Sequence, residues 1–140
     1  MGGVPGRLSI DEMLAAARAT LPHRIAANEL DKVMARGALV VDTRPVHQRE
    51  SEGELQGAVI IDRNVLEWRL DPASPHHIAE ASSYDIEVVV VCSEGFSSSL
   101  VAATLQQLGL HQATDLDGGF RAYQAHRASQ GLSDASRGTS

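Results

Sequence analysis

The sequence has only one cysteine in its 140 residues. A single cysteine excludes an internal disulfide, and the absence of a cysteine pair argues against a structural zinc site. Basic residues are also fewer than acidic ones, 12 against 18, so the net charge is −6 at pH 7. Because nucleic acids are bound by basic surfaces, this charge argues against a nucleic-acid partner.

Long apolar runs and targeting signals are missing as well. The valine run at 88–91 is far too short to span a bilayer, so we expect no membrane partner. The first residues, MGGVPGRLSI, lack the order of basic, apolar and small residues that marks a signal peptide, which makes a cytoplasmic location the expectation. A hydrophobic content of 43% and a charged content of 21% are typical of one globular domain.

The chain alternates between short apolar segments and segments with helical spacing. Strands are predicted at 24–26, 38–45, 57–62, 86–92 and 113–119. Helices are predicted at 9–21, 28–37, 64–70, 97–110 and 120–130, the first with Ser9 as N-cap and Glu12 closing a capping box, the second with Asn28 as N-cap. This alternation predicts an α/β domain around a mostly parallel sheet, with helices on both faces because the strands show no polar face.

Cys92 follows the most apolar predicted strand and precedes a helix that starts near Ser97 or Ser98. Sites in parallel sheets form at the carboxyl ends of strands, and a helix start offers unpaired N–H groups. Gly95 can take the positive φ that lets a tight loop turn its N–H groups around an anion. We therefore interpret Cys92 as a nucleophile with a lowered pKa. The alternative is a small buried core side chain, which the position at the strand exit disfavours.

Four segments together resemble the single-domain rhodaneses in their order and spacing. They are LVVDTRP at 39–45, GELQGAVII at 53–61, VVVVCSEGFSSSLVAATLQQLGL at 88–110 and DLDGGFRAYQ at 115–124. The resemblance implies a five-stranded, mostly parallel sheet flanked by helices. It also implies that Cys92 accepts a sulfane sulfur from a donor as a persulfide and passes it to cyanide or to a thiol, a protein thiol included. No metal and no organic cofactor is implied.

The resemblance makes the five residues after Cys92 an active-site loop, whose backbone amides would surround the persulfide anion. These residues are Ser93, Glu94, Gly95, Phe96 and Ser97. The simpler interpretation of Asp42 and Arg44 is a local ion pair or a turn at the end of a strand. By resemblance the aspartate lies close to the loop and helps to shape it, so both are expected as supporting residues.

The sulfur donor stays open between thiosulfate, mercaptopyruvate and a persulfide. Many members of the family that use thiosulfate carry a basic residue in the loop, where this chain has Ser93 and Glu94. Glu94 would repel a dianionic donor if its carboxylate faced inward, and it could equally point to solvent.

Proteins with two other functions have the same predicted fold. A phosphatase of the dual-specificity type needs a longer loop and an arginine six positions after the cysteine, and that position is Ser98. A non-catalytic rhodanese-like module that binds a partner or senses a small thiol remains the alternative. The serines at 97–99 are predicted to cap a helix rather than to act as nucleophiles.

The resemblance and the composition divide the chain into three parts. Residues 1–23 are expected to form an N-terminal extension with a short helix, residues 24–130 the rhodanese-like domain, and residues 131–140 a disordered tail of small polar residues.

Overall fold

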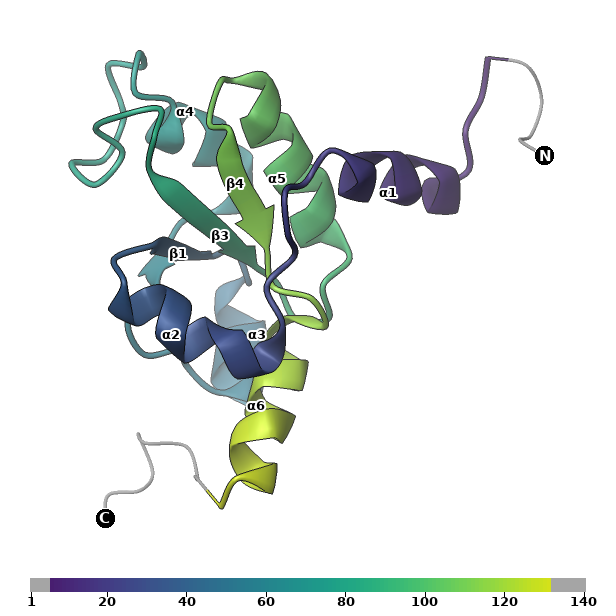
Figure 1. The fold of residues 1–140 in the computed structure, drawn as a ribbon, viewed down its shortest axis with the longest axis vertical. Helices are drawn as coiled ribbons and strands as arrows, with labels where there is room; N and C mark the ends of the chain where they lie inside the picture. The colour runs from purple at the N-terminus through teal and green to yellow at the C-terminus, as the bar shows by residue number, and fades with distance from the viewer. Residues whose placement is uncertain (1–5, 132–140) are drawn as a thin grey trace.

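Four parallel strands form one sheet in the order β2-β1-β3-β4 (Figure 1). The strands are β1 (Leu39–Asp42), β2 (Val59–Ile60), β3 (Glu87–Val91) and β4 (Gln112–Asp115). The computed structural model describes residues 6–131, so the predicted disordered tail lies outside the described residues except for Gly131. The predicted parallel α/β sheet is confirmed.

The prediction of a fifth strand is wrong. At residues 24–26 only Ile25 pairs with the sheet, through a single parallel bridge to Leu116. The pairing stops after Ile25 because the chain turns into the 3₁₀ helix η1 (Ala27–Glu29), whose start is fixed by a hydrogen bond from the Ala26 N–H to the Glu29 carboxylate (2.7 Å). Before Ile25, the carbonyl of His23 accepts a hydrogen bond from the side-chain hydroxyl of Thr114 (2.8 Å).

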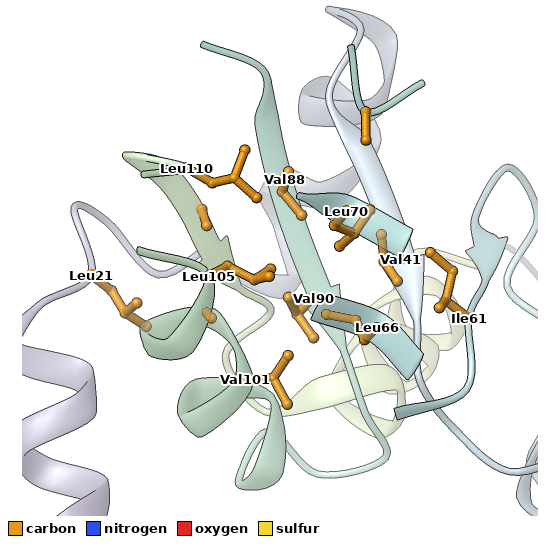
Figure 2. Packing of buried hydrophobic residues seen from close by; sticks show 13 residues of the cluster. Leu21, Val41, Ile61, Leu66, Leu70, Val88, Val90, Val101, Leu105 and Leu110 are labelled. Atoms are coloured by element: carbon orange, nitrogen blue, oxygen red, sulfur yellow. The ribbon is translucent and has the colours of Figure 1, made fainter. Parts of the chain in front are cut away.

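Helices cover both faces of the sheet, as predicted. They are α1 (Ile10–Ala19), α2 (Leu30–Ala35), α3 (Val46–Glu52), α4 (Leu66–Leu70), α5 (Ser97–Gln107) and α6 (Gly119–Ser129), with 3₁₀ helices η1 (Ala27–Glu29) and η2 (Arg63–Val65). On one face Val88 and Val90 pack with buried leucines of α4 and α5 (Figure 2). On the other face Val89 and Val91 pack against α2 and α6. The central strand β3 is therefore buried on both sides, which explains its run of valines.

The start of α1 matches its prediction. Ser9 accepts a hydrogen bond from the Glu12 N–H (3.0 Å), and the Glu12 carboxylate accepts one from the Ser9 N–H (2.7 Å). The helix ends at Ala19 and lies beside α5 (Figure 1). Asn28 is not an N-cap: it lies inside η1, where the Glu29 carboxylate does the capping.

Helix α3 was not among the predicted elements. It begins after Pro45, and its sequence, VHQRESE, has one apolar residue and no apolar stripe. Each of its side chains is at least partly exposed, so burial left no periodic signal in the sequence. Within residues 6–131, no helix is long and apolar enough to cross a membrane.

Candidate active site

The carboxyl ends of three neighbouring strands bring three reactive or charged side chains to one edge of the sheet. Cys92 follows β3, Asp42 ends β1 and Asp115 ends β4. The register places Asp42 opposite Val91 and Asp115 opposite Val90. This is the edge at which parallel sheets build their sites, and the loop from Cys92 to the start of α5 covers it.

The thiol of Cys92 is almost fully buried, with 8% of the residue exposed. Its sulfur accepts a hydrogen bond from the Gly95 N–H at 3.1 Å. Burial works to raise the pKa of Cys92, but the Ser98 and Ser97 hydroxyls and the backbone N–H groups of Ser98 and Gly95 outweigh it, and the pKa is lowered. The Ser98 hydroxyl has one proton and lies within hydrogen-bonding distance of Asp115 (2.7 Å), so it cannot donate to the carboxylate and to the sulfur at the same time. The Ser97 hydroxyl and the two N–H groups are therefore the donors that do not compete with Asp115.

The first carbonyls of the loop are tied to the start of α6. The Cys92 carbonyl accepts a hydrogen bond from the Phe120 N–H (2.8 Å), and the Ser93 carbonyl accepts one from the Arg121 N–H (3.0 Å). Peptide bonds among the described residues are all trans, so each carbonyl points opposite to the next N–H group. The N–H groups of Ser93 and Glu94 therefore point away from α6.

The close approach of α6 depends on glycine. A Cβ atom on Gly119 would lie 2.6 Å from the Cys92 carbonyl oxygen and from the Glu94 nitrogen. A Cβ on Gly95 would lie 2.7 Å from the Gly118 nitrogen. All three glycines have positive φ, between 67° and 86°. The glycine pair that follows β4 thus lets the start of α6 contact the backbone of the loop.

A third loop carbonyl is held by arginines from the N-terminal part of the chain. The Gly95 carbonyl accepts hydrogen bonds from Nη2 of Arg18 (2.8 Å) and Nη2 of Arg24 (3.1 Å). By the same peptide geometry the N–H of Phe96 points away from these arginines. The Phe96 side chain itself is 57% exposed. Three carbonyls of the loop thus face donors outside it, and the N–H group that follows each of them points away from those donors.

Asp115 is a fully buried carboxylate behind the loop. It forms a bidentate ion pair with Arg24 (2.8 and 3.1 Å). It also accepts hydrogen bonds from the hydroxyls of Ser98 (2.7 Å) and Ser99 (2.8 Å). The prediction that the serines at 97–99 cap the helix is therefore wrong: α5 begins at Ser97 after Phe96 as N-cap, and the hydroxyls of Ser98 and Ser99 satisfy a buried charge.

Asp42 and Arg44 form the predicted local ion pair. Nε and Nη2 of Arg44 donate to the two carboxylate oxygens of Asp42 at 3.0 and 2.8 Å, and both side chains are buried. The Arg44 guanidinium lies 4.0 Å above the ring of Phe120, the residue whose N–H binds the Cys92 carbonyl. The pair therefore packs against the same helix start that holds the loop.

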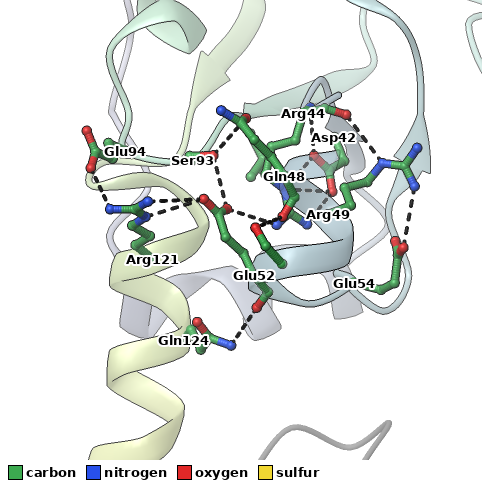
Figure 3. Close-up of polar contacts among 12 residues, drawn as sticks. Asp42, Arg44, Gln48, Arg49, Glu52, Glu54, Ser93, Glu94, Arg121 and Gln124 are labelled. Carbon is green, nitrogen blue, oxygen red and sulfur yellow. Dashed lines mark hydrogen bonds and ion pairs between the residues drawn. The ribbon is translucent and has the colours of Figure 1, made fainter. Parts of the chain in front are cut away.

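Helix α3 contributes Glu52, which connects the loop to this pair (Figure 3). Its carboxylate accepts hydrogen bonds from the Ser93 hydroxyl (3.0 Å) and from Nη1 of Arg44 (3.2 Å), and Gln48 offers the hydroxyl a second acceptor at 3.0 Å. Arg121 of α6 adds an ion pair at 3.4 Å. Sequence reasoning missed Glu52, because α3 itself was not predicted.

Glu94 faces α6 and solvent. Its carboxylate forms an ion pair with Nη1 of Arg121 at 2.8 Å, and its side chain is 53% exposed (Figure 3). The N–H of the same residue points to the other side of the loop. Within residues 6–131, no three histidine, cysteine or acidic side chains are grouped to hold a metal ion.

A family model and the relatives that the chain resembles identify its family. The model of the rhodanese-like domain matches residues 26–126. The thiosulfate sulfurtransferase GlpE of Pseudomonas aeruginosa (strain PAO1) is 32% identical over 106 residues, 74% of this chain and 84% of that protein. A Rhodopseudomonas palustris structure described as a protein of unknown function and possible tyrosine phosphatase gives a TM-score of 0.76 at 27% identity, covering 90% of this chain and 96% of that one. The human single-domain sulfurtransferase TSTD1 gives 0.60 at 25% identity, covering 71% and 93%.

Because its pKa is lowered, Cys92 should become reactive at a lower pH than an ordinary cysteine thiol. The rate of alkylation by iodoacetamide should reach half its maximum at a lower pH in the folded chain than in the same chain unfolded in urea, where a free thiol titrates near about 8.5. The reason is that donors to the sulfur favour the thiolate. An equal or higher midpoint in the folded chain would show that burial dominates instead.

Replacing Gly119 by alanine is expected to displace the loop. Gly119→Ala should lower the free energy of unfolding by about 2–4 kcal/mol more than Gly37→Ala, and should slow alkylation of Cys92 at pH 7. Both substitutions place alanine at positive φ, but only the Cβ at 119 meets backbone atoms, since nothing lies within 4 Å at 37. Urea unfolding and alkylation rates measure the two effects. Equal losses in the two variants would contradict the role given to the contact.

Proposed function

Because the chain belongs to the rhodanese-like domain family, we propose that it is a sulfurtransferase in which Cys92 carries the transferred sulfur as a persulfide. The observation that supports this most is the loop itself. Three of its carbonyls accept hydrogen bonds from α6 and from the arginines, and its Gly95 N–H donates to the sulfur of a thiol whose pKa is lowered. Such an arrangement suits an anion attached to the cysteine sulfur.

The first half of the proposed reaction loads the cysteine. The Cys92 thiolate attacks the sulfane sulfur of the donor, and a new S–S bond forms as the bond to the donor breaks. The leaving group takes the bonding electron pair, as sulfite does when the donor is thiosulfate. The terminal sulfur of the persulfide keeps a negative charge, which the N–H groups of residues 93–97 would stabilise.

The second half discharges the persulfide to an external acceptor. Cyanide or a thiolate attacks the terminal sulfur, the S–S bond breaks, and the Cys92 thiolate is regenerated. Because the chain has one cysteine, it cannot release the sulfur by forming an internal disulfide. The acceptor is therefore a small nucleophile or the thiol of another molecule.

The supporting residues act through the position of the loop. Arg44 neutralises Asp42 and contacts Phe120, and Glu52 accepts from the Ser93 hydroxyl. These contacts fix the side of the loop that faces α3 and α6. We propose them as positioning residues, since they contact the loop and the start of α6.

A phosphatase activity fits this site poorly. Six positions after Cys92, where such an enzyme needs an arginine for the phosphate oxygens, stands Ser98, buried and hydrogen-bonded to Asp115. The next arginine in the chain after Cys92 is Arg121, which pairs with Glu94 and Glu52 on the α6 side of the loop. Its guanidinium thus serves to hold the loop.

Intact-mass spectrometry tests the proposal. Incubation with thiosulfate, with 3-mercaptopyruvate or with a polysulfide should add the mass of one sulfur to the chain, and cyanide should remove it. Cys92→Ser, which keeps a similar side-chain volume but no thiolate, should gain nothing. If no donor adds sulfur to the wild-type chain while iodoacetamide still modifies Cys92, the chain is a binding or sensing module and the enzymatic proposal fails.

Although Glu94 faces α6 and solvent, its negative charge beside the loop is expected to slow the approach of thiosulfate through long-range repulsion, which salt screens. Glu94→Gln removes one negative charge beside the loop and leaves the positive charge of Arg121 less compensated. The value of kcat/KM for thiosulfate should therefore rise about two- to tenfold at low salt, and this gain should be smaller at high salt. Steady-state kinetics with cyanide as acceptor measure this. Glu80→Gln is the matched control, because Glu80 is exposed in the segment that leads to the amino end of β3, opposite the Cys92 edge. A gain of the same size in both variants would remove any local role of Glu94.

A further inference from the structure

Two arginines that precede the family-matched residues 26–126 reach the active-site loop. Arg18 lies in the last turn of α1, and Arg24 lies one residue before the bridge at Ile25. Both donate to the carbonyl of Gly95, at 2.8 and 3.1 Å. A segment outside the matched domain therefore takes part in the geometry of the cysteine loop.

The two guanidinium groups are fixed by further contacts. Nε of Arg18 donates to the Ser99 hydroxyl (3.0 Å), which in turn donates to Asp115 (2.8 Å). Arg24 forms its bidentate pair with the same carboxylate and a second ion pair with Asp117 (3.1 Å). Because Asp115 is fully buried, the hydrogen bonds that converge on it hold both arginines with little freedom.

The effect on the loop follows from the peptide between Gly95 and Phe96. With its carbonyl held by two charged donors, this peptide directs the Phe96 N–H to the opposite side. The preceding peptide places the Gly95 N–H 3.1 Å from the Cys92 sulfur. The positive charges add a second effect: the pKa of Arg24 is raised mainly by its hydrogen bond to Asp115, and attraction to the Cys92 sulfur contributes in the same direction.

We propose that Arg18 and Arg24 are positioning residues that hold the Gly95–Phe96 peptide with its carbonyl oxygen directed toward their guanidinium groups. In this way they favour the anionic form of the sulfur at Cys92, as the bare thiolate or as the terminal sulfur of a persulfide. The N-terminal helix α1 thus has a role at the site: it supplies Arg18. For the bare thiolate the inference stands on geometry alone, and for the persulfide it rests on the proposed function.

Arg18 is the better residue to test, because removing Arg24 would leave the buried Asp115 without its ion pair. Arg18→Gln removes the charge and Arg18→Lys keeps it without the planar fork. Arg7→Gln is the matched control: Arg7 is exposed, belongs to the same segment, and makes no hydrogen bond or ion pair with residues 6–131. The readouts are the pH midpoint of Cys92 alkylation, the amount of sulfur loaded from a polysulfide, and the melting temperature.

Arg18→Gln should raise the alkylation midpoint and slow alkylation at pH 7 about three- to tenfold, since a shift of one pKa unit changes the thiolate fraction about tenfold. Arg18→Lys should recover part of the rate, and Arg7→Gln should match the wild type. Should Arg18→Gln fail to fold, a raised midpoint in Arg18→Lys supports the inference by itself.

An unchanged midpoint in folded Arg18→Gln, with or without a lower melting temperature, would overturn the inference, because Arg18 would then serve stability alone. A wild-type chain that loads no sulfur, together with a raised midpoint in Arg18→Gln, would refute the proposed function and leave the positioning role of Arg18 supported. The two proposals therefore fail on different measurements.

Discussion

The site depends on where the carbonyl groups of the Cys92 loop point. The start of α6 binds the carbonyls of Cys92 and Ser93, and two arginines bind that of Gly95. With these oxygens occupied from outside, the N–H groups that follow them point away from those donors, which suits an anion attached to the thiol. The need for glycine at the start of α6, where a Cβ would meet the loop backbone, is one consequence. Burial works to raise the pKa of Cys92, and further donors of the same loop and of the start of α5, the Ser98 and Ser97 hydroxyls and the N–H groups of Ser98 and Gly95, lower it.

The position of Cys92 in the fold could be predicted from the sequence, because it depends on local patterns. A run of valines identifies a strand buried on both faces, and a polar loop with glycine after it identifies a strand exit. These two patterns are sufficient to place the cysteine between them at the carboxyl edge of a parallel sheet. Asp115 is missing from the predicted site residues, because the predicted strand at 113–119 runs past it, whereas β4 ends at Asp115.

The rest could not be predicted, because it depends on tertiary contacts. Helix α3 has no apolar stripe, and Glu52 becomes part of the site only through partners distant in sequence. Arg18 lies 77 residues before the carbonyl it binds. The fifth strand ends after one bridge because the chain turns into η1 at Ala27, where the Glu29 carboxylate binds the Ala26 N–H. Helical and strand periodicity in a sequence indicates which side chains are buried in the core. Glu52 and Arg18 contribute to the site through hydrogen bonds and charge instead, so periodicity does not identify them.

A crystal structure of the chain after incubation with a sulfur donor would test the central claim most directly. We expect one additional sulfur bonded to Sγ of Cys92, lying on the side of the loop away from α6 and from the two arginines, within hydrogen-bonding distance of N–H groups from residues 93–97. An additional sulfur that faces carbonyl oxygens, or a loop whose carbonyls have left α6 and the arginines, would contradict it.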